Sequence, residues 1–342
     1  MSLPDPIILG DTRLGPPVFL APMAGITDLP FRRAVARHGG AGLMVSEMVA
    51  STEMVTPRPS TRMAVRAKAM TEGDLPVSVQ IAGREAGAMA ETARIVAGMG
   101  ARIIDINMGC PAKKVTGGLS GAALMRDLDH ALELVDAVVG AVPDLPVTLK
   151  MRLGWDEDCL NAPELATRAT SAGVRMLTVH GRTRAQFYTG TADWQRIRKV
   201  ANVAGRPPLV ANGDVVDAAS ARAALEQSGA EAVMVGRGAQ GQPWKLAQIA
   251  HELWGTTAPE IPQGAALADD IAEHYQDILS LYGTELGLRV ARKHLGWYAE
   301  ANGAPNRAEL LRAASPEATL AAIRAGFADA GQAGLPPMET ST

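Results

Sequence analysis

The stretch IIDINMGCPAKK, residues 103–114, joins two kinds of sequence. Its first six residues are mostly apolar and predict a strand buried on both faces, as in a parallel sheet covered by helices. The chain then turns through Gly109, Cys110 and Pro111 into two lysines. A buried strand that ends in chemically active residues is typical of an α/β enzyme with its site at the carboxyl ends of the strands.

Seven further segments repeat the apolar pattern between residues 17 and 238. They are 17–23, 42–48, 76–82, 146–152, 175–182, 208–214 and 231–238. Helical patterns lie between them, including 85–100, 129–142 and 217–229. A doubly wound sheet also alternates strands and helices, but eight evenly spread units favour a (β/α)8 barrel.

The sequence changes character after the eighth segment. Pro259 and Pro262 flank a linker, and helical patterns follow at 266–283, 284–303 and 315–331. Ser315 before Pro316 predicts a helix N-cap with proline at the first helical position. We therefore expect a barrel domain over residues 1–255 and a small all-helical domain over residues 256–342.

Composition limits the class of protein. The 342 residues are 47% hydrophobic and 20% charged, with a formal net charge of -3, so a nucleic-acid site must be local. Cys110 and Cys159 are the only cysteines, which predicts neither a disulfide framework nor a zinc cluster. Because the sequence has no signal-peptide or membrane-spanning pattern, we expect a cytoplasmic protein. We also expect a monomer without a metal.

Two strand ends offer chemistry with more than one interpretation. Cys110 follows a strand in a turn with Lys113 and Lys114 close behind, and it could serve as nucleophile or acid, whereas Cys159 looks structural. Lys150 ends the fifth strand and could form a Schiff base or act as a fixed cation beside an anionic cofactor.

The last three strand ends favour a bound ligand, and the last two favour its phosphate. ANGDV (211–215) and VGRGAQG (235–241) follow strands seven and eight, where barrels often bind the phosphate of a mononucleotide. His180, in VHGR (179–182), could be a core histidine, but its position at a strand end favours a contact with cofactor or substrate.

Nine motifs together resemble the bacterial tRNA-dihydrouridine synthases, most closely the B-type branch. The resemblance runs from about residue 5 to 330. The motifs are APMAGITD (21–28), SEM (46–48), VQIAG (79–83), DINMGCPAKKV (105–115), TLKMRLGW (148–155), TVHGRTR (178–184), ANGDV (211–215), GRGAQGQPW (236–244) and RVARKHLGWY (289–298).

The resemblance implies an FMN-binding barrel, a helical tRNA-recognition domain and NADPH or NADH as electron donor. Reduced FMN would give hydride to C6 of a D-loop uridine, and Cys110 would protonate C5. This implication favours the fixed-cation role for Lys150. The residues implied to hold FMN are Pro22, Met23, Ala24, Gln80, Lys150, His180, Asn212, Gly213, Asp214, Gly236 and Arg237.

The resemblance also implies a tRNA substrate. Asn107 and Arg152 match family positions near the uracil, and Arg289, Arg292 and Lys293 fall at helical spacing that would suit phosphates or a plain solvated face. Lys113, Lys114 and Arg184 would join them at the barrel mouth. Gly117 and Gly118 stand where relatives often have basic residues, so that loop should contribute less to RNA binding.

Two other functions remain open from the sequence. One is an FMN-dependent reductase of a free small pyrimidine, which would not need the helical domain. The other is a tRNA-binding protein without catalysis, against which Cys110, Lys150 and His180 argue.

Overall fold

Eight parallel strands form a closed barrel in the computed structural model, which describes residues 5–56, 69–70 and 77–328. Neighbouring strands pair in the order β4-β3-β11-β10-β9-β8-β7-β6, and pairing of β4 with β6 closes the ring. The strands are β3 (Val18–Leu20), β4 (Leu43–Val45), β6 (Val77–Ala82), β7 (Ile103–Met108), β8 (Val147–Arg152), β9 (Met176–His180), β10 (Leu209–Asn212) and β11 (Ala232–Val235). Each predicted segment contains one strand, and the barrel prediction is confirmed.

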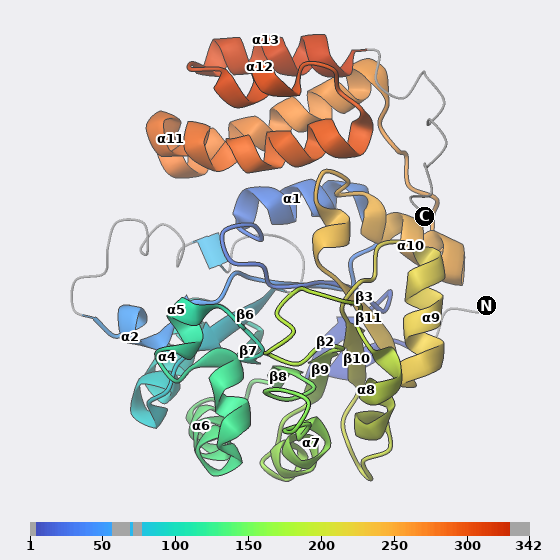
Figure 1. Cartoon of the computed structure of the whole chain (residues 1–342). Helices are drawn as coiled ribbons and strands as arrows, with labels where there is room; N and C mark the ends of the chain where they lie inside the picture. Colours follow the sequence, from blue (N-terminus) through green and yellow to red (C-terminus); the bar gives the residue numbers. More distant parts are fainter. Residues whose placement is uncertain (1–4, 57–68, 71–76, 329–342) are drawn as a thin grey trace.

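Helices surround these strands in Figure 1. They are α1 (Leu29–His38), α4 (Ala86–Gly98), α6 (Leu128–Ala141), α7 (Ala162–Ser171), α8 (Trp194–Ala201), α9 (Ala218–Ser228) and α10 (Lys245–Trp254). Shorter elements lie in the loops: β5 (Val49–Ala50), α2 (Ser51–Met54), α5 (Lys113–Thr116) and the 3-10 turns η1 (Gly121–Arg126) and η2 (Arg237–Ala239). The three predicted barrel helices are present, with ends within two residues of the prediction.

A hairpin closes the amino-terminal end of the barrel. Its strands, β1 (Ile7–Leu9) and β2 (Thr12–Leu14), pair antiparallel. Their apolar side chains form one buried cluster with residues that begin barrel strands, such as Ile103 and Met176. Burial of this surface removes the water from that end of the barrel. The opposite end, where the strands finish, remains available for a binding site.

The carboxyl-terminal part is helical, as predicted. It consists of α11 (Gly264–Asn302), α12 (Arg307–Arg312) and α13 (Pro316–Phe327), which share a second hydrophobic core. Backbone angles of φ 72° and ψ 168° at Gly283 break α11, where the sequence predicted two helices to meet. Ser315 caps α13 by accepting a hydrogen bond from the Ala318 amide. The domain division at residue 255 stays a prediction, because Trp244 also joins this second core.

The ends of two predicted elements lie outside the described residues. They are residue 76 of a predicted strand and residues 329–331 of the last predicted helix.

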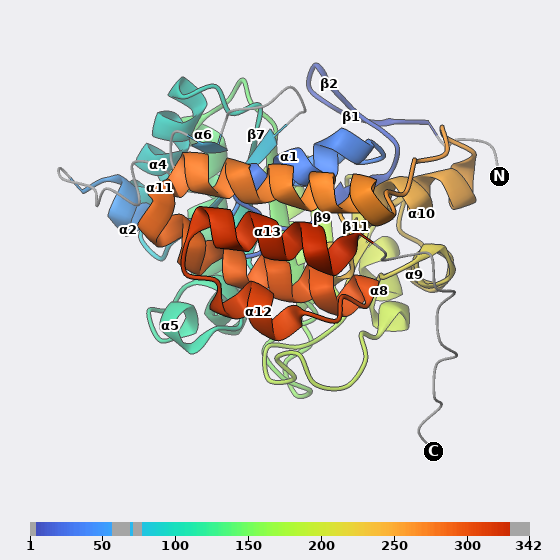
Figure 2. The same cartoon turned by 90° about the horizontal axis from the view of Figure 1, so that it is seen from above.

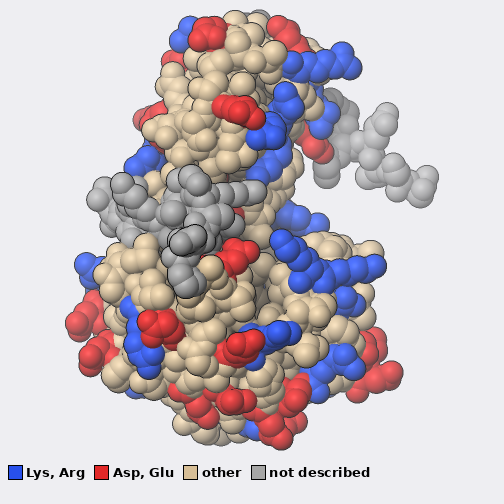
Figure 3. Space-filling view, turned by 90° about the vertical axis from the view of Figure 1, so that its left-hand side faces the viewer, with Lys and Arg blue, Asp and Glu red and all other residues tan. Residues whose placement is uncertain are grey.

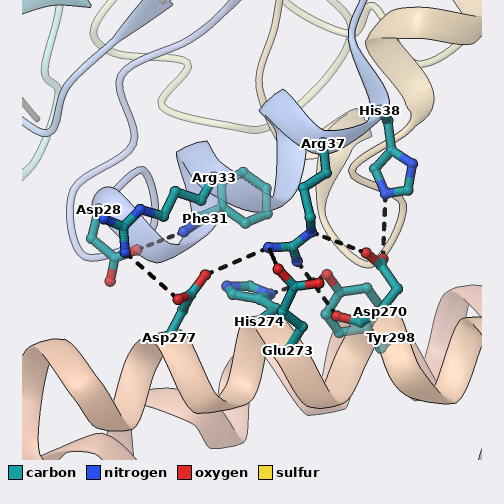
Figure 4. A network of polar contacts seen from close by, with 10 residues as sticks. All are labelled: Asp28, Phe31, Arg33, Arg37, His38, Asp270, Glu273, His274, Asp277 and Tyr298. Carbon is teal, nitrogen blue, oxygen red and sulfur yellow. Dashed lines mark hydrogen bonds and ion pairs between the residues drawn. The ribbon is translucent and has the colours of Figure 1, made fainter. Parts of the chain in front are cut away.

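The helical part is attached to the barrel through α1 and α11, which lie side by side in both views (Figures 1 and 2). Figure 4 shows Arg37 of α1 pointing at carboxylates of α11, with ion pairs of 3.3 Å to Asp270 and 3.1 Å to Glu273. Partly exposed pairs add little stability each. The buried ring of Phe31 also packs 5.9 Å from that of His274, so apolar contact contributes the larger share.

The described residues contain neither a helix suited to span a membrane nor a cluster of side chains suited to bind a metal ion. No helix within residues 5–56, 69–70 and 77–328 is long and apolar enough to cross a membrane. The same part of the chain holds no group of three or more His, Cys, Asp or Glu side chains placed to bind a metal ion.

Candidate active site

A cavity of about 620 Å³ lies at the carboxyl ends of the barrel strands. Its walls contain the predicted catalytic residue, two predicted uracil contacts and all eleven predicted cofactor residues. These are Cys110, Asn107, Arg152, Pro22, Met23, Ala24, Gln80, Lys150, His180, Asn212, Gly213, Asp214, Gly236 and Arg237. The site therefore gathers residues from five strands, β6 to β10, and from loops, including those that follow β3 and β11.

Strand register explains why these side chains meet. Asn107 is the register partner of Lys150 on the next strand, and Arg152 is the partner of His180. His180 is in turn aligned with Asn212. Residues at one level of a parallel barrel contribute their side chains to the same layer. The register of these strands therefore brings the side chains together at the floor of the cavity.

Lys150 is a half-buried cation fixed by a short hydrogen-bond chain. Its Nζ donates to Oδ1 of Asn212 at 2.9 Å, and Nδ2 of Asn212 donates to the Met234 carbonyl at 2.8 Å. Burial, reinforced by the nearby charge of Arg152, lowers the pKa of Lys150 to about 8. The side chain thus remains mostly protonated at neutral pH and faces the cavity as a positive charge.

His180 is neutral in this setting. Burial and then the positive charges of Lys150, Arg152, Arg182 and Arg237 lower the pKa of the imidazole well below its ordinary value. Its Nδ1 is buried and has no hydrogen-bond partner among the described residues. An unpaired buried nitrogen on a cavity wall is costly unless a ligand meets it.

Gly213 packs too closely against its neighbours to carry a side chain. Its φ is +107°, and a Cβ there would lie 2.8 Å from the Cβ of Ala192 and 3.2 Å from Cε1 of His180. This is closer than real Cβ contacts allow. Glycine is therefore required at position 213, where its backbone packs against the imidazole of His180 on the cavity wall.

Asp214 lines the cavity, but its carboxylate is bound by an arginine. Its carboxylate accepts bonds of 2.9 and 2.7 Å from the two terminal nitrogens of Arg182 and one of 2.8 Å from the Ala192 amide. Burial would raise the pKa of Asp214, but these bonds and the charge of Arg237 outweigh it and lower the pKa. The sequence placed Arg182 at a strand end without a role, and the structure makes it the buried partner of Asp214.

A second polar chain runs beneath the cavity and ends at the cysteine. The buried carboxylate of Asp105 accepts from Thr148 Oγ1 and from Gln80 Nε2, both at 2.6 Å. Gln80 Oε1 accepts from Asn107 Nδ2 at 2.7 Å. Asn107 Oδ1 then accepts from the Gly109 amide at 3.0 Å and from the Cys110 amide at 2.9 Å.

The chain gives Asn107 a task that the sequence did not predict. Its amide oxygen holds the turn that carries Cys110, and its amide nitrogen is bonded to Gln80. Contact with a uracil edge remains a prediction for this residue. Asp105 itself was missed, because a carboxylate inside an apolar strand was taken as part of the strand; its position between Ile104 and Ile106 was the available signal.

Arg152 also organises loops. Its guanidinium donates to three backbone carbonyls, those of Gly109 at 2.9 Å, Thr183 at 2.7 Å and Phe187 at 2.8 Å.

Tyr188 is an aromatic residue that is 49% exposed and lines the cavity, with its ring 5.7 Å from the guanidinium of Arg152. An exposed aromatic at the mouth offers a surface on which a base can stack. Sequence reasoning missed it, although FY in an otherwise polar loop was a signal.

The remaining predicted RNA contacts lie outside the cavity. Lys113 and Lys114 are exposed on α5, whereas Arg184 is half-buried, 4.6 Å over the ring of Trp155. On α11, Arg292 is exposed and Arg289 is 62% exposed. Figure 3 shows Lys and Arg side chains gathered where the helical part rises from the barrel, beside a hollow between the two. The predicted RNA contacts belong to three separate segments, α5, the loop after β9 and α11, and do not form one continuous row.

Lys293 differs from the other predicted phosphate contacts. It is half-buried and donates a hydrogen bond to the Gly25 carbonyl in the barrel. The helical spacing that grouped it with Arg289 and Arg292 did not reveal which side of the helix meets the barrel.

A closed parallel barrel with its site at the carboxyl ends of the strands defines a (β/α)8-barrel enzyme. The family model described as dihydrouridine synthase (Dus) matches residues 19–330. A probable tRNA-dihydrouridine synthase of Rhodobacter capsulatus is 68% identical over 94% of this chain and 98% of its own. The tRNA-dihydrouridine synthase B of Xanthomonas campestris pv. campestris is 45% identical over 96% and 98%. This chain belongs to the dihydrouridine synthase family.

The solved structures add the fold alone. Morphinone reductase in complex with tetrahydroNAD superposes with a TM-score of 0.55 at 15% identity, covering 78% of this chain and 94% of that one. The family and its curated relatives support a tRNA-dihydrouridine synthase function and an oxidoreductase reaction.

Proposed function

We propose that this protein reduces the C5=C6 bond of a D-loop uridine in tRNA to 5,6-dihydrouridine, using FMN held in the cavity and NADPH or NADH as electron donor. The observation that carries the proposal is that Cys110 and a half-buried cation, Lys150, line one cavity at the carboxyl end of the barrel.

The walls fit a flat, partly anionic cofactor. The fit rests on the unpaired Nδ1 of His180 and on the positive charges of Lys150 and Arg237 on the cavity wall. Lys150 and Arg237 would hold negative charge, and Pro22, Met23, Ala24, Gln80, Asn212, Asp214 and Gly236 would surround the rest. FMN bound here would supply the hydride for C6 of the uracil.

Cys110 is proposed as the source of the proton for C5. It lines the cavity, and its backbone is held at both ends: the amide donates to Asn107, and the carbonyl accepts from the Ala122 amide at 3.0 Å. A thiol fixed in this way can donate its proton to the carbon and regain one from water. Asn107 and Arg152 hold the loops around it and are the proposed contacts to the uracil.

The tRNA is proposed to lie across the barrel mouth and the helical part. The target base must leave its stack to reach the cavity, at a cost of about a few kcal/mol that backbone contacts offset. Lys113, Lys114, Arg184, Arg289 and Arg292 are the proposed phosphate contacts. Tyr188 is added as a stacking surface.

The test compares two cysteine variants. Cys110→Ala should keep FMN and its reduction by NADPH but lose most tRNA turnover. The matched control is Cys159→Ala, because Cys159 is not among the cavity-lining residues and its thiol donates to the Met125 carbonyl at 3.7 Å; its loss should leave turnover unchanged. Normal turnover in Cys110→Ala would refute the proton donor.

Two outcomes would refute the wider proposal. Reduction of free uracil or orotate as fast as tRNA would favour a small-pyrimidine reductase. Unchanged dihydrouridine content in tRNA from cells that lack the gene, measured by mass spectrometry, would favour a tRNA-binding protein without catalysis.

A further inference from the structure

One side chain of the helical part reaches the turn that forms a wall of the cavity. Lys293, on the second half of α11, donates from Nζ to the backbone carbonyl of Gly25. The amide of Gly25 donates to Oε1 of Glu47, a buried carboxylate just after β4. Gly25 is therefore held through its N–H by the barrel and through its C=O by the helical part.

Gly25 lies inside a tight turn. The Met23 carbonyl accepts from the amides of Ile26 at 2.9 Å and Thr27 at 3.0 Å, and the Met23 amide donates to Thr27 Oγ1 at 2.9 Å. Met23, Ala24 and Ile26 all line the cavity. Because these bonds tie the ends of the turn together, a shift of Gly25 moves the cavity wall with it.

The backbone of Gly25 is suited to this contact. Its φ is +76°, in the region that glycine adopts without strain. The position at which a side chain would begin lies 3.5 Å from Nζ of Lys293. That distance is an ordinary van der Waals contact, so the positive φ, and not space for the ammonium group, favours glycine at this position.

A second contact from α11 reaches the same segment. The Tyr282 hydroxyl donates to Oδ2 of Asp28 at 2.9 Å, and Asp28 caps α1 by accepting from the Phe31 amide at 3.1 Å. Tyr282 precedes the break in α11 at Gly283, whereas Lys293 follows it. Both halves of α11 thus hold the residues that follow β3.

The outer face of the same helix bears the proposed tRNA contacts. Arg289 and Arg292 are exposed, and Lys293, one residue further on, turns toward the barrel. A displacement of this part of α11 by bound tRNA would reach Gly25 through a single hydrogen bond. The proposed tRNA contacts on α11 and Lys293 therefore lie within about one helical turn of each other.

We propose that Lys293 is a positioning residue that couples tRNA binding on α11 to cofactor binding in the barrel by fixing the turn from Met23 to Thr27. The inference rests on the proposed function. Coupled binding is reciprocal, so tRNA changes the affinity for FMN by the same factor by which FMN changes the affinity for tRNA.

The test measures FMN binding to flavin-free protein by the quenching of flavin fluorescence, with and without an unmodified tRNA transcript. Lys293→Met should bind FMN about tenfold more weakly, the size expected for a lost hydrogen bond from a charged donor, and should lose the effect of tRNA. Lys293→Arg keeps a charged donor and should recover most of both. Arg292→Met should weaken tRNA binding and leave the FMN affinity measured without tRNA unchanged.

Several results would overturn the coupling. The first is a Lys293→Met variant that binds FMN as tightly as the wild type does. The second is a wild-type protein whose affinity for FMN is the same with and without tRNA. Circular dichroism checks folding; if the Met variant does not fold, Lys293→Gln, which keeps a polar group at the interface, takes its place with the same criteria. Wild-type protein that binds no FMN, or reduces no tRNA, would refute the proposed function instead.

Discussion

Asp105→Ala should destabilise the protein and loosen the turn that carries Cys110. The substitution removes a carboxylate that accepts two bonds of 2.6 Å, from Thr148 and from Gln80. Each partner would be left buried without an acceptor, at about 1–3 kcal/mol, so the expected loss is about 2–6 kcal/mol. A typical domain has about 5–15 kcal/mol of stability, so the variant should still fold.

Asp105→Asn is the matched control. The amide oxygen of asparagine can still accept from Gln80, and its NH2 group can donate to the Thr148 hydroxyl, which accepts as well as donates. The expected change is within about 1 kcal/mol, because no partner loses its bond. The two variants therefore separate the loss of hydrogen bonding from the loss of charge.

Two assays check this prediction. Urea unfolding gives the free energy of unfolding, and mass spectrometry of the Cys110 peptide gives the rate of alkylation of that thiol. The Ala variant should be less stable and more rapidly alkylated, with lower tRNA turnover. If the Ala and Asn variants had equal stability and equal alkylation rates, the polar chain from Asp105 to Cys110 would not hold the turn.

Three further outcomes follow from single groups. Gly213→Ala should weaken FMN binding and lower the melting temperature, because the new Cβ would lie 2.8 Å from another Cβ at a φ of +107°, and retained flavin and calorimetry check this. FMN affinity should fall as pH rises through the Lys150 pKa of about 8, and a fluorescence titration from pH 7 to 9 should show no such fall in Lys150→Met. Burial lowers the pKa of His274 to about 3, below its unfolded value, so its contribution to stability is complete above pH ~6.5 and is lost as pH falls toward 3, by at most about 1.4 kcal/mol per pH unit. Urea unfolding at pH 7 and 4.5 should show a smaller difference in His274→Leu than in wild type.

The sequence was enough to predict the barrel and the residues around the cavity. Each strand is continuously apolar, and polar residues follow it directly, so the strand ends could be found without knowing which strands pair. Lys150 and His180 were assigned to one site on this basis, and both line the cavity.

The partners of those residues could not be predicted in the same way. Hydrogen bonds such as Gln80 to Asp105 join side chains on different strands, and their choice depends on register and rotamer rather than on local pattern. Lys293 shows the same limit for a helix. Spacing grouped it with Arg289, but contact with the barrel loop, far away in sequence, decides which way it faces.

Charge repulsion inside the cavity is what an anionic ligand would relieve. Burial and the charge of Arg152 lower the pKa of Lys150 to about 8. Burial and then the nearby cations lower the pKa of His180, and Arg182 occupies the carboxylate of Asp214. A bound anion favours the protonated lysine and raises its pKa. At pH 8 Lys150 is about half protonated before FMN binds, because the pH equals its pKa. Binding of one FMN should therefore cause Lys150 to take up at most about half a proton. Calorimetry in buffers of different ionisation enthalpy measures that uptake, and Lys150→Met should abolish this share; equal uptake in both proteins would mean that Lys150 does not face the anionic part of the cofactor.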